Sequence, residues 1–158
     1  RDIAFVGGPD SNLSARQRYQ AYRDGLEANG IPLNASWIFS GDFTMPSGYL
    51  ATIELLDSCP TRPTAVFYCN DMMAIGGFHA LQKRGLSVPK DMSVVGFDDI
   101  NFAEYTIPPL TTVHQNHYDV GREAGELLMS MRQNPGGQNR RIILEQSLVV
   151  RESVRSLP

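Results

Sequence analysis

The sequence is poor in three features that would assign a protein class at once: cysteine, excess positive charge and long hydrophobic stretches. Only two cysteines, Cys59 and Cys69, occur in 158 residues, which is too few for a disulfide scaffold and fits a reducing compartment such as the cytoplasm. The formal net charge is -3, so the chain has no basic surplus for DNA phosphates or an anionic membrane. No apolar run approaches membrane-spanning length. We therefore expect neither direct DNA binding nor a membrane segment in this chain.

Signatures of nucleotide binding and nucleophilic catalysis are also missing. The sequence contains no G-x-G-x-x-G, no G-x-x-x-x-G-K-[ST] and no G-x-S-x-G pattern, and neither cysteine lies in a recognisable Cys/His context. His114 and His117 lie close together but have no Cys or acidic partner at metal-ligand spacing. We expect no cofactor and no metal ion.

What the sequence does contain is a regular alternation of two patterns. Short apolar segments bounded by Gly, Pro or Asn alternate with segments of helical periodicity. The expected strands cover 3–6, 36–40, 65–69, 93–97 and 110–113; the expected helices begin near Ser14, Pro46, Asn70 and Tyr118; a last extended segment or hairpin covers 142–144 and 147–150. This order predicts an α/β fold with a doubly wound, mostly parallel sheet and helices on both faces.

The stretch VVGFDD at 94–99 is an apolar strand that ends in two carboxylates, Asp98 and Asp99. In a doubly wound sheet, ligands bind at the carboxyl ends of the strands, so this stretch is a candidate floor of a binding site. Catalysis by paired carboxylates and simple capping of a turn are the alternatives. Adjacent extended residues point to opposite sides of a strand, which argues against an acid/base pair.

The other loops expected at this edge of the sheet carry arginine, amide and aromatic groups. A carboxylate accepts from two hydroxyls, a guanidinium donates to two oxygens, and a ring covers an apolar patch. The set therefore suits a small polar or polyhydroxylated ligand, with Arg18, Asn70 and Asp98 as the principal contacts. For Phe43, a surface ring that only covers a loop is the alternative.

Several segments, in order over essentially the whole chain, form a recognisable set: IAFVGG at 3–8, RYQAY at 18–22, PTAVF at 63–67, NDMMAIG at 70–76, GLSVPKD at 85–91, VVGFDD at 94–99, PPLTTV at 108–113 and RES at 151–153. This set resembles the effector-binding domain of LacI/GalR-type bacterial transcriptional repressors. One departure is Ala21, where such proteins commonly carry glycine, and it concerns only local helix packing.

The resemblance implies how the chain is divided. Residues 1–114 are expected to be the C-terminal lobe of a periplasmic-binding-protein-like type I domain. Residues 115–158 are expected to be a crossover, a helix and terminal strands that pack with an N-terminal lobe absent here. The chain would thus be a fragment of a longer one, whose helix-turn-helix reads operator DNA. A homodimer is implied, with the helix after Asp71 and the loop 100–107 near the partner.

The resemblance also implies the site and the activity. Effector contacts carried over by position are Arg18, Asn70, Asp98, Phe43 as a stacking ring and Gln115 at the crossover, with Arg16 and Asp42 as further candidates. The expected function is sensing: a small sugar-like metabolite binds between two lobes and changes the operator affinity of the attached DNA-binding domain. No bond is made or broken, so no enzyme is expected. The alternative is a ribose-type periplasmic solute-binding protein.

Overall fold

The computed structural model describes residues 2–59, 61–133 and 140–156. In chain order its elements are β1 (Ile3–Gly7), α1 (Leu13–Ala28), the 3-10 helix η1 (Ala35–Trp37), β2 (Ile38–Ser40), α2 (Met45–Ser58), β3 (Ala65–Tyr68), α3 (Asp71–Lys83), β4 (Ser93–Val95), the 3-10 helix η2 (Asn101–Tyr105), β5 (Thr112–His114), α4 (His117–Gln133) and β6 (Ser147–Val149). None of these helices is both long and apolar enough to cross a lipid bilayer.

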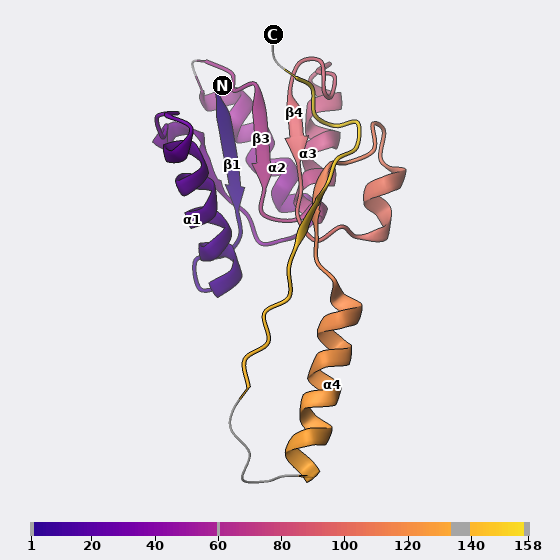
Figure 1. The fold of residues 1–158 in the computed structure, drawn as a ribbon. Coiled ribbons are helices and arrows are strands. Elements are labelled where there is room, and N and C mark those ends of the chain that lie inside the picture. Colours follow the sequence, from indigo (N-terminus) through magenta and orange to yellow (C-terminus); the bar gives the residue numbers. More distant parts are fainter. Residues whose placement is uncertain (1, 60, 134–139, 157–158) are drawn as a thin grey trace.

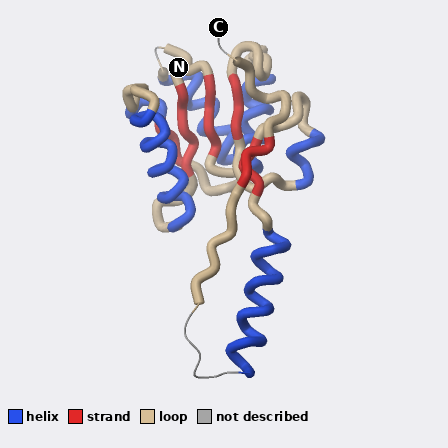
Figure 2. Tube along the Cα trace, in the orientation of Figure 1, coloured by secondary structure: helices blue, strands red, loops and turns tan. Residues whose placement is uncertain are grey.

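The centre of the lobe is a four-stranded sheet in the order β2-β1-β3-β4, with every neighbouring pair parallel. Helix α1 lies on one face, and α2 and α3 lie on the other (Figures 1 and 2). On the α1 face the ring of Phe5 stacks on Tyr22 at 5.0 Å between centroids. On the opposite face the Tyr68 hydroxyl meets that of Thr52 in α2 at 2.7 Å. The predicted doubly wound, mostly parallel sheet with helices on both faces is confirmed.

Local capping explains where the helices begin. Asn12 accepts from the amide of Ala15 to begin α1, and Asn70 accepts from the amide of Met73 to begin α3. Helix α3 ends before Gly85, whose φ of 69° suits glycine. These caps place the first turn of α3 at the carboxyl end of β3, next to the turn that follows β4.

Helices α2 and α3 approach each other closely because two glycines face the partner helix. A Cβ atom on Gly48 would lie 2.1 Å from the carbonyl oxygen of Met73, and one on Gly76 would lie 2.0 Å from that of Met45. Side chains at these positions would push the helices apart. The two helices therefore form a tightly packed layer that supports the sheet from one side.

Some strand limits differ from the predictions. Strand β2 begins only at Ile38, because Asn34 accepts from the amide of Ser36 and starts a 3-10 turn there. Strand β4 ends at Val95, and the segment 142–144 is not a strand. Strand β5 touches the main sheet only through isolated bridges, and its ladder partner is the antiparallel β6. The predicted fifth strand of the main sheet is thus mostly part of a separate two-stranded sheet.

Helix α4 projects away from the lobe, with the returning segment beside it (Figure 1). The helix was predicted, but none of its residues is buried. Val120, Leu128 and Met131, which have core spacing in the sequence, are 52%, 68% and 53% exposed. Within the described residues, the returning segment lies against part of this apolar stripe and leaves these three side chains more than half exposed.

Candidate functional site

The carboxylate of Asp98 is the centre of a polar cluster at the carboxyl edge of the sheet. Its Oδ1 accepts from Nη2 of Arg18 at 3.1 Å and from Nε2 of Gln115 at 2.6 Å. Arg18 projects from α1, Asp98 follows β4 and Gln115 follows β5, so the fold brings together three segments that are distant in sequence. Oδ2 of Asp98 receives no hydrogen bond from the part of the chain that the structure describes. One carboxylate oxygen is therefore free for a ligand hydroxyl or amine.

The Arg18 guanidinium makes two further contacts besides that with Asp98. Its Nη1 donates to the carbonyl oxygen of Cys69 at 2.5 Å, and its guanidinium lies 3.7 Å from the centroid of the Phe97 ring. The Arg18 side chain is 14% exposed and that of Asp98 is 23% exposed. The arginine therefore presents a preorganised cation at the rim of the site.

Burial raises the pKa of Asp98 above its ordinary value, although the Arg18 charge and the hydrogen bond from Gln115 oppose the shift. The carboxylate has thus lost water without full compensation from its protein donors. Donors on a bound ligand would stabilise its charged form further.

Asn70 and Phe43 lie in a second, adjoining part of the cluster. Asn70 caps α3 with Oδ1, and its Nδ2 donates to the carbonyl oxygen of Phe43 at 3.0 Å. Phe43 has a φ of 70° and its ring is half-buried over Gly8, where an added Cβ would lie 2.4 Å from ring atoms. The ring does cover a neighbouring loop, as the simpler interpretation expected. Asn70 directly follows Cys69, whose carbonyl oxygen accepts from Arg18, so Asn70 and Phe43 adjoin the Asp98 cluster.

Arg16 lies in the first turn of α1 and Asp42 lies in the turn after β2, and both side chains make only local contacts. Arg16 is exposed and donates to the carbonyl oxygen of Asp10 at 2.6 Å. Asp42 accepts from the amide and hydroxyl of Thr44, at 3.0 and 2.6 Å. Hydrogen bonds from Ser47 and Thr44 lower the pKa of Asp42 to about 2. No described contact joins Arg16 or Asp42 to the Asp98 cluster.

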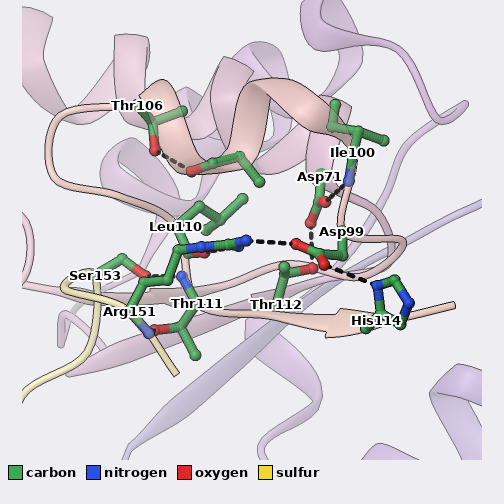
Figure 3. Close-up of polar contacts among 11 residues, drawn as sticks. Asp71, Asp99, Ile100, Thr106, Leu110, Thr111, Thr112, His114, Arg151 and Ser153 are labelled. Carbon is green, nitrogen blue, oxygen red and sulfur yellow. Dashed lines mark hydrogen bonds and ion pairs between the residues drawn. The ribbon is translucent and has the colours of Figure 1, made fainter. Parts of the chain in front are cut away.

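Sequence reasoning missed a second polar cluster, which surrounds Asp99 (Figure 3). Asp99 accepts from Nη2 of Arg151 at 2.7 Å and contacts Nδ1 of His114 at 2.8 Å. Asp71, the first residue of α3, is fully buried and accepts from the Thr112 hydroxyl at 2.5 Å and from the Ile100 amide at 2.9 Å. The RES motif at 151–153 was the available signal, because a guanidinium forms strong hydrogen bonds with a carboxylate that the fold brings close.

The backbone of the turn also differs from the prediction. Asp98 and Asp99 were treated as extended residues, whereas their φ angles are 114° and 55°. Their carboxylates nevertheless contact different partners: Arg18 and Gln115 for Asp98, and Arg151 and His114 for Asp99. The two acids therefore act in separate clusters.

A groove of about 340 Å³ begins at the site and runs between α4 and the returning segment. Its lining includes Gln115, Val120, Leu127, Ile142 and Leu144. Gln115 thus belongs both to the Asp98 cluster and to the start of this groove. The site lies where the chain leaves the lobe.

Comparison with known sequences identifies the family. Residues 1–154 match the periplasmic binding protein-like domain family. The chain is 39% identical over 157 residues to the ribose operon repressor of Haemophilus influenzae, covering 99% of this chain and 47% of that protein. It is 38% identical over 156 residues to the transcriptional repressor CytR of Escherichia coli, covering 99% of this chain and 46% of that protein. The chain thus spans about half the length of the relatives it matches.

Solved structures of similar fold point to the same family. The transcriptional regulator CelR in complex with cellobiose has a TM-score of 0.91 at 38% identity, over 97% of this chain and 46% of that one. The lac repressor dimer bound to operator and an anti-inducer has a TM-score of 0.89 at 34% identity, over 98% of this chain and 53% of that one. The chain belongs to the periplasmic binding protein-like domain family, in the form carried by LacI-type transcriptional regulators.

Proposed function

We propose that this chain is the C-terminal part of the effector-sensing domain of a LacI-type transcriptional regulator, and that it binds a small sugar-like metabolite. The observation that carries the proposal is the Asp98 carboxylate, which is held by Arg18 and Gln115 and keeps Oδ2 open at the edge of the lobe. A carboxylate and a guanidinium side by side suit the paired hydroxyls of a sugar. The further contacts we propose are Asn70, Phe43 and, at the rim, Arg16.

The proposed action is binding rather than catalysis. An effector that fits one arrangement of two lobes better than another shifts the population toward that arrangement. Operator DNA would be bound by a part of the regulator outside this chain, which agrees with the net charge of -3. The matched relatives named above are transcriptional repressors, which favours sensing in the cytoplasm over periplasmic transport.

The second lobe would cover the part of the chain that projects from this one. Helix α4 carries exposed apolar residues and borders the groove that begins at Gln115. Arg151 and Ser153, by contrast, bond to the backbone of this lobe at Leu110 and Val94. We therefore propose that the described residues that pack with the other lobe are 115–133 and 140–146, whereas 115–158 was expected.

A second copy of the chain is the proposed partner of the face formed by α2, α3 and the loop after η2. This face exposes Leu50 at 64%, Tyr105 at 75% and Ile107 at 95%, beside apolar grooves lined by Ile75 and His79. An exposed apolar surface of this kind marks an interface. Sedimentation of the full-length regulator should show a dimer, and Ile107→Asp should shift it toward monomer.

Calorimetric titration of the full-length regulator with cellobiose and D-ribose, followed by the purine hypoxanthine, tests the sugar assignment. We expect one of the two sugars to bind, and Asp98→Ala to weaken binding by about 100-fold or more, because a charge-assisted acceptor is lost. Asp57→Asn is the matched control, since it removes an exposed aspartate paired with Arg84 at 2.6 Å, away from the site. Unchanged sugar affinity in Asp98→Ala would refute the site; binding of hypoxanthine alone would refute the sugar class.

A further inference from the structure

Two chain segments run side by side in the connection between the lobe and α4 (Figure 1). We call this connection, formed by β5 and β6, the neck. Strand β5 leaves the lobe toward Gln115, and β6 returns toward Arg151. The strands pair antiparallel, with Thr112 opposite Val149 and His114 opposite Ser147. Within this chain, these two strands connect the lobe to α4 and the returning segment, so a movement of α4 relative to the lobe is transmitted through them.

The carboxylate of Asp99 contacts both crossing segments at once (Figure 3). Oδ2 meets Nδ1 of His114 in β5 at 2.8 Å, and Oδ1 accepts from Nη2 of Arg151, just after β6, at 2.7 Å. The side chains of Asp99 and Arg151 are only 15% and 19% exposed. Because these side chains are shielded from water, the Coulombic attraction between them is larger than in an exposed pair.

Arg151 is itself anchored to the segment that leads into β5. Its Nη1 donates to the carbonyl oxygen of Leu110 at 2.9 Å, and its amide donates to the hydroxyl of Thr111 at 2.9 Å. Asp99, Arg151 and the start of β5 thus form one connected unit. A shift of the returning segment must displace either Arg151 or Asp99.

The turn that carries Asp99 also carries Asp98. Both residues have positive φ, 114° and 55°, a conformation that L-residues rarely adopt and that surrounding contacts must hold. From the core side, Asp71 holds the turn through the Ile100 amide and the Thr112 hydroxyl. From the side of β5 and β6, the turn is held by the Asp98 amide, which donates to the carbonyl oxygen of Val113 at 2.9 Å, and by the Asp99 carboxylate, which is the contact that also reaches the returning segment.

We propose that Asp99 is a positioning residue that couples the two crossing strands to the effector-binding carboxylate of Asp98. The inference rests on the proposed sensing function and deepens it. Rearrangement of β5 and β6 changes the contacts of Asp99 with His114 and Arg151, and the strained turn passes this change to Asp98. Reciprocally, an effector held by Asp98 favours the arrangement in which Asp99 keeps both contacts.

The test compares Asp99→Asn with Asp57→Asn in the full-length regulator. Hydrogen exchange without ligand and titration with cellobiose and D-ribose are measured on each variant. For Asp99→Asn we expect faster amide exchange in residues 96–100 and in 147–152, and sugar affinity about ten-fold lower. Asp57→Asn, which also breaks an Asp-Arg pair, should change neither. The Arg151→Lys variant should keep more of the sugar affinity than Arg151→Gln, because lysine retains the positive charge beside Asp99.

Unchanged exchange at 96–100 in Asp99→Asn would overturn the proposal. Faster exchange spread equally over β1 and β3 would also overturn it, since that pattern indicates a general loss of stability. If the unmodified regulator binds neither sugar, the sugar assignment fails, and the exchange measurement still decides the coupling. In that case, faster amide exchange in Asp99→Asn that is confined to residues 96–100 and 147–152 supports the coupling through Asp99.

Discussion

Three neighbouring aspartates have different roles because their partners differ. Burial raises the pKa of Asp71 to about 6 and also raises that of Asp98, against opposing hydrogen bonds. Burial acts on Asp99 in the same direction, but hydrogen bonds from Arg151 and His114 outweigh it and hold its pKa below the ordinary value. The acid that joins the crossing strands is therefore the most readily ionised of the three.

The buried carboxyl of Asp71 should make stability depend on pH. Its folded-state pKa of about 6 lies above the unfolded value of about 4, so the folded protein binds the proton more tightly. The resulting stabilisation is fully present below about pH 4 and is lost as pH rises through 6, by up to about 3 kcal/mol. Urea unfolding at intervals from pH 4 to pH 7 measures this loss.

The Asp71→Asn variant identifies the source of that pH dependence. Asp98, whose pKa is also raised, contributes in the same direction in both proteins, so the difference between the two curves isolates Asp71. We expect the variant to be less stable at pH 4 and to lose less stability on going to pH 7. Parallel curves for the two proteins would show that Asp71 is not the responsible group.

At the scale of elements, the contact between α2 and α3 depends on the absence of two side chains. Added Cβ atoms at Gly48 and Gly76 would meet backbone oxygens at 2.1 and 2.0 Å. Because backbone cannot move as the end of a flexible side chain can, the helices would have to separate. The layer that positions Asn70 at the site would move with them.

Gly48→Ala and Gly76→Ala should each destabilise the lobe by about 1–3 kcal/mol or more, the usual cost of overpacking. Gly25→Ala in the exposed interior of α1 is the matched control, since nothing lies within 4 Å of its added Cβ. It should stabilise by about 0.5–1 kcal/mol through helix propensity. Denaturant midpoints of the three variants measure the effects, and equal midpoints for Gly25→Ala and Gly48→Ala would contradict the packing argument.

At the scale of the whole molecule, the two parts of the chain are stabilised unequally. Residues around the main sheet are buried on both sides, whereas α4 buries none of its residues. An amphipathic helix with an exposed apolar stripe gains little from packing, and most of the stability of helices in proteins comes from such packing. Its stability should therefore come from the rest of the regulator.

Hydrogen exchange of the isolated chain and of the full-length regulator tests this dependence. We expect amides in 117–133 to exchange rapidly in the isolated chain and to be protected by at least ten-fold in the full-length protein, because the proposed second lobe would cover the helix. Helix α1 (Leu13–Ala28) is the internal control and should be similarly protected in both. Equal exchange of α4 in the two proteins would contradict the proposed packing.

Much of the fold was predictable because its signals are local. Apolar segments such as 65–69, the cap Asn70 and the stop at Gly85 each act over a few residues and determine where strands and helices lie. The first helix was expected from about Ser14 and begins at Leu13, after the cap Asn12. The candidate site was predictable in part, since polar residues after parallel strands converge at one edge. Arg18, Asp98 and Gln115 do meet there.

Only the tertiary structure decided the rest. The pairing of β5 with β6, the bonds of Asp71 to Thr112 and of Asp99 to Arg151, and the positive φ angles of the turn have no local signal. Asp99 and Arg151 are separated by 52 positions, and the choice between one arginine and another depends on which segments the fold brings together. The sequence by itself determined a parallel α/β lobe with a polar edge. The three-dimensional packing determined which carboxylate is open to a ligand and which one joins the crossing strands, because burial and partners are properties of the assembled chain.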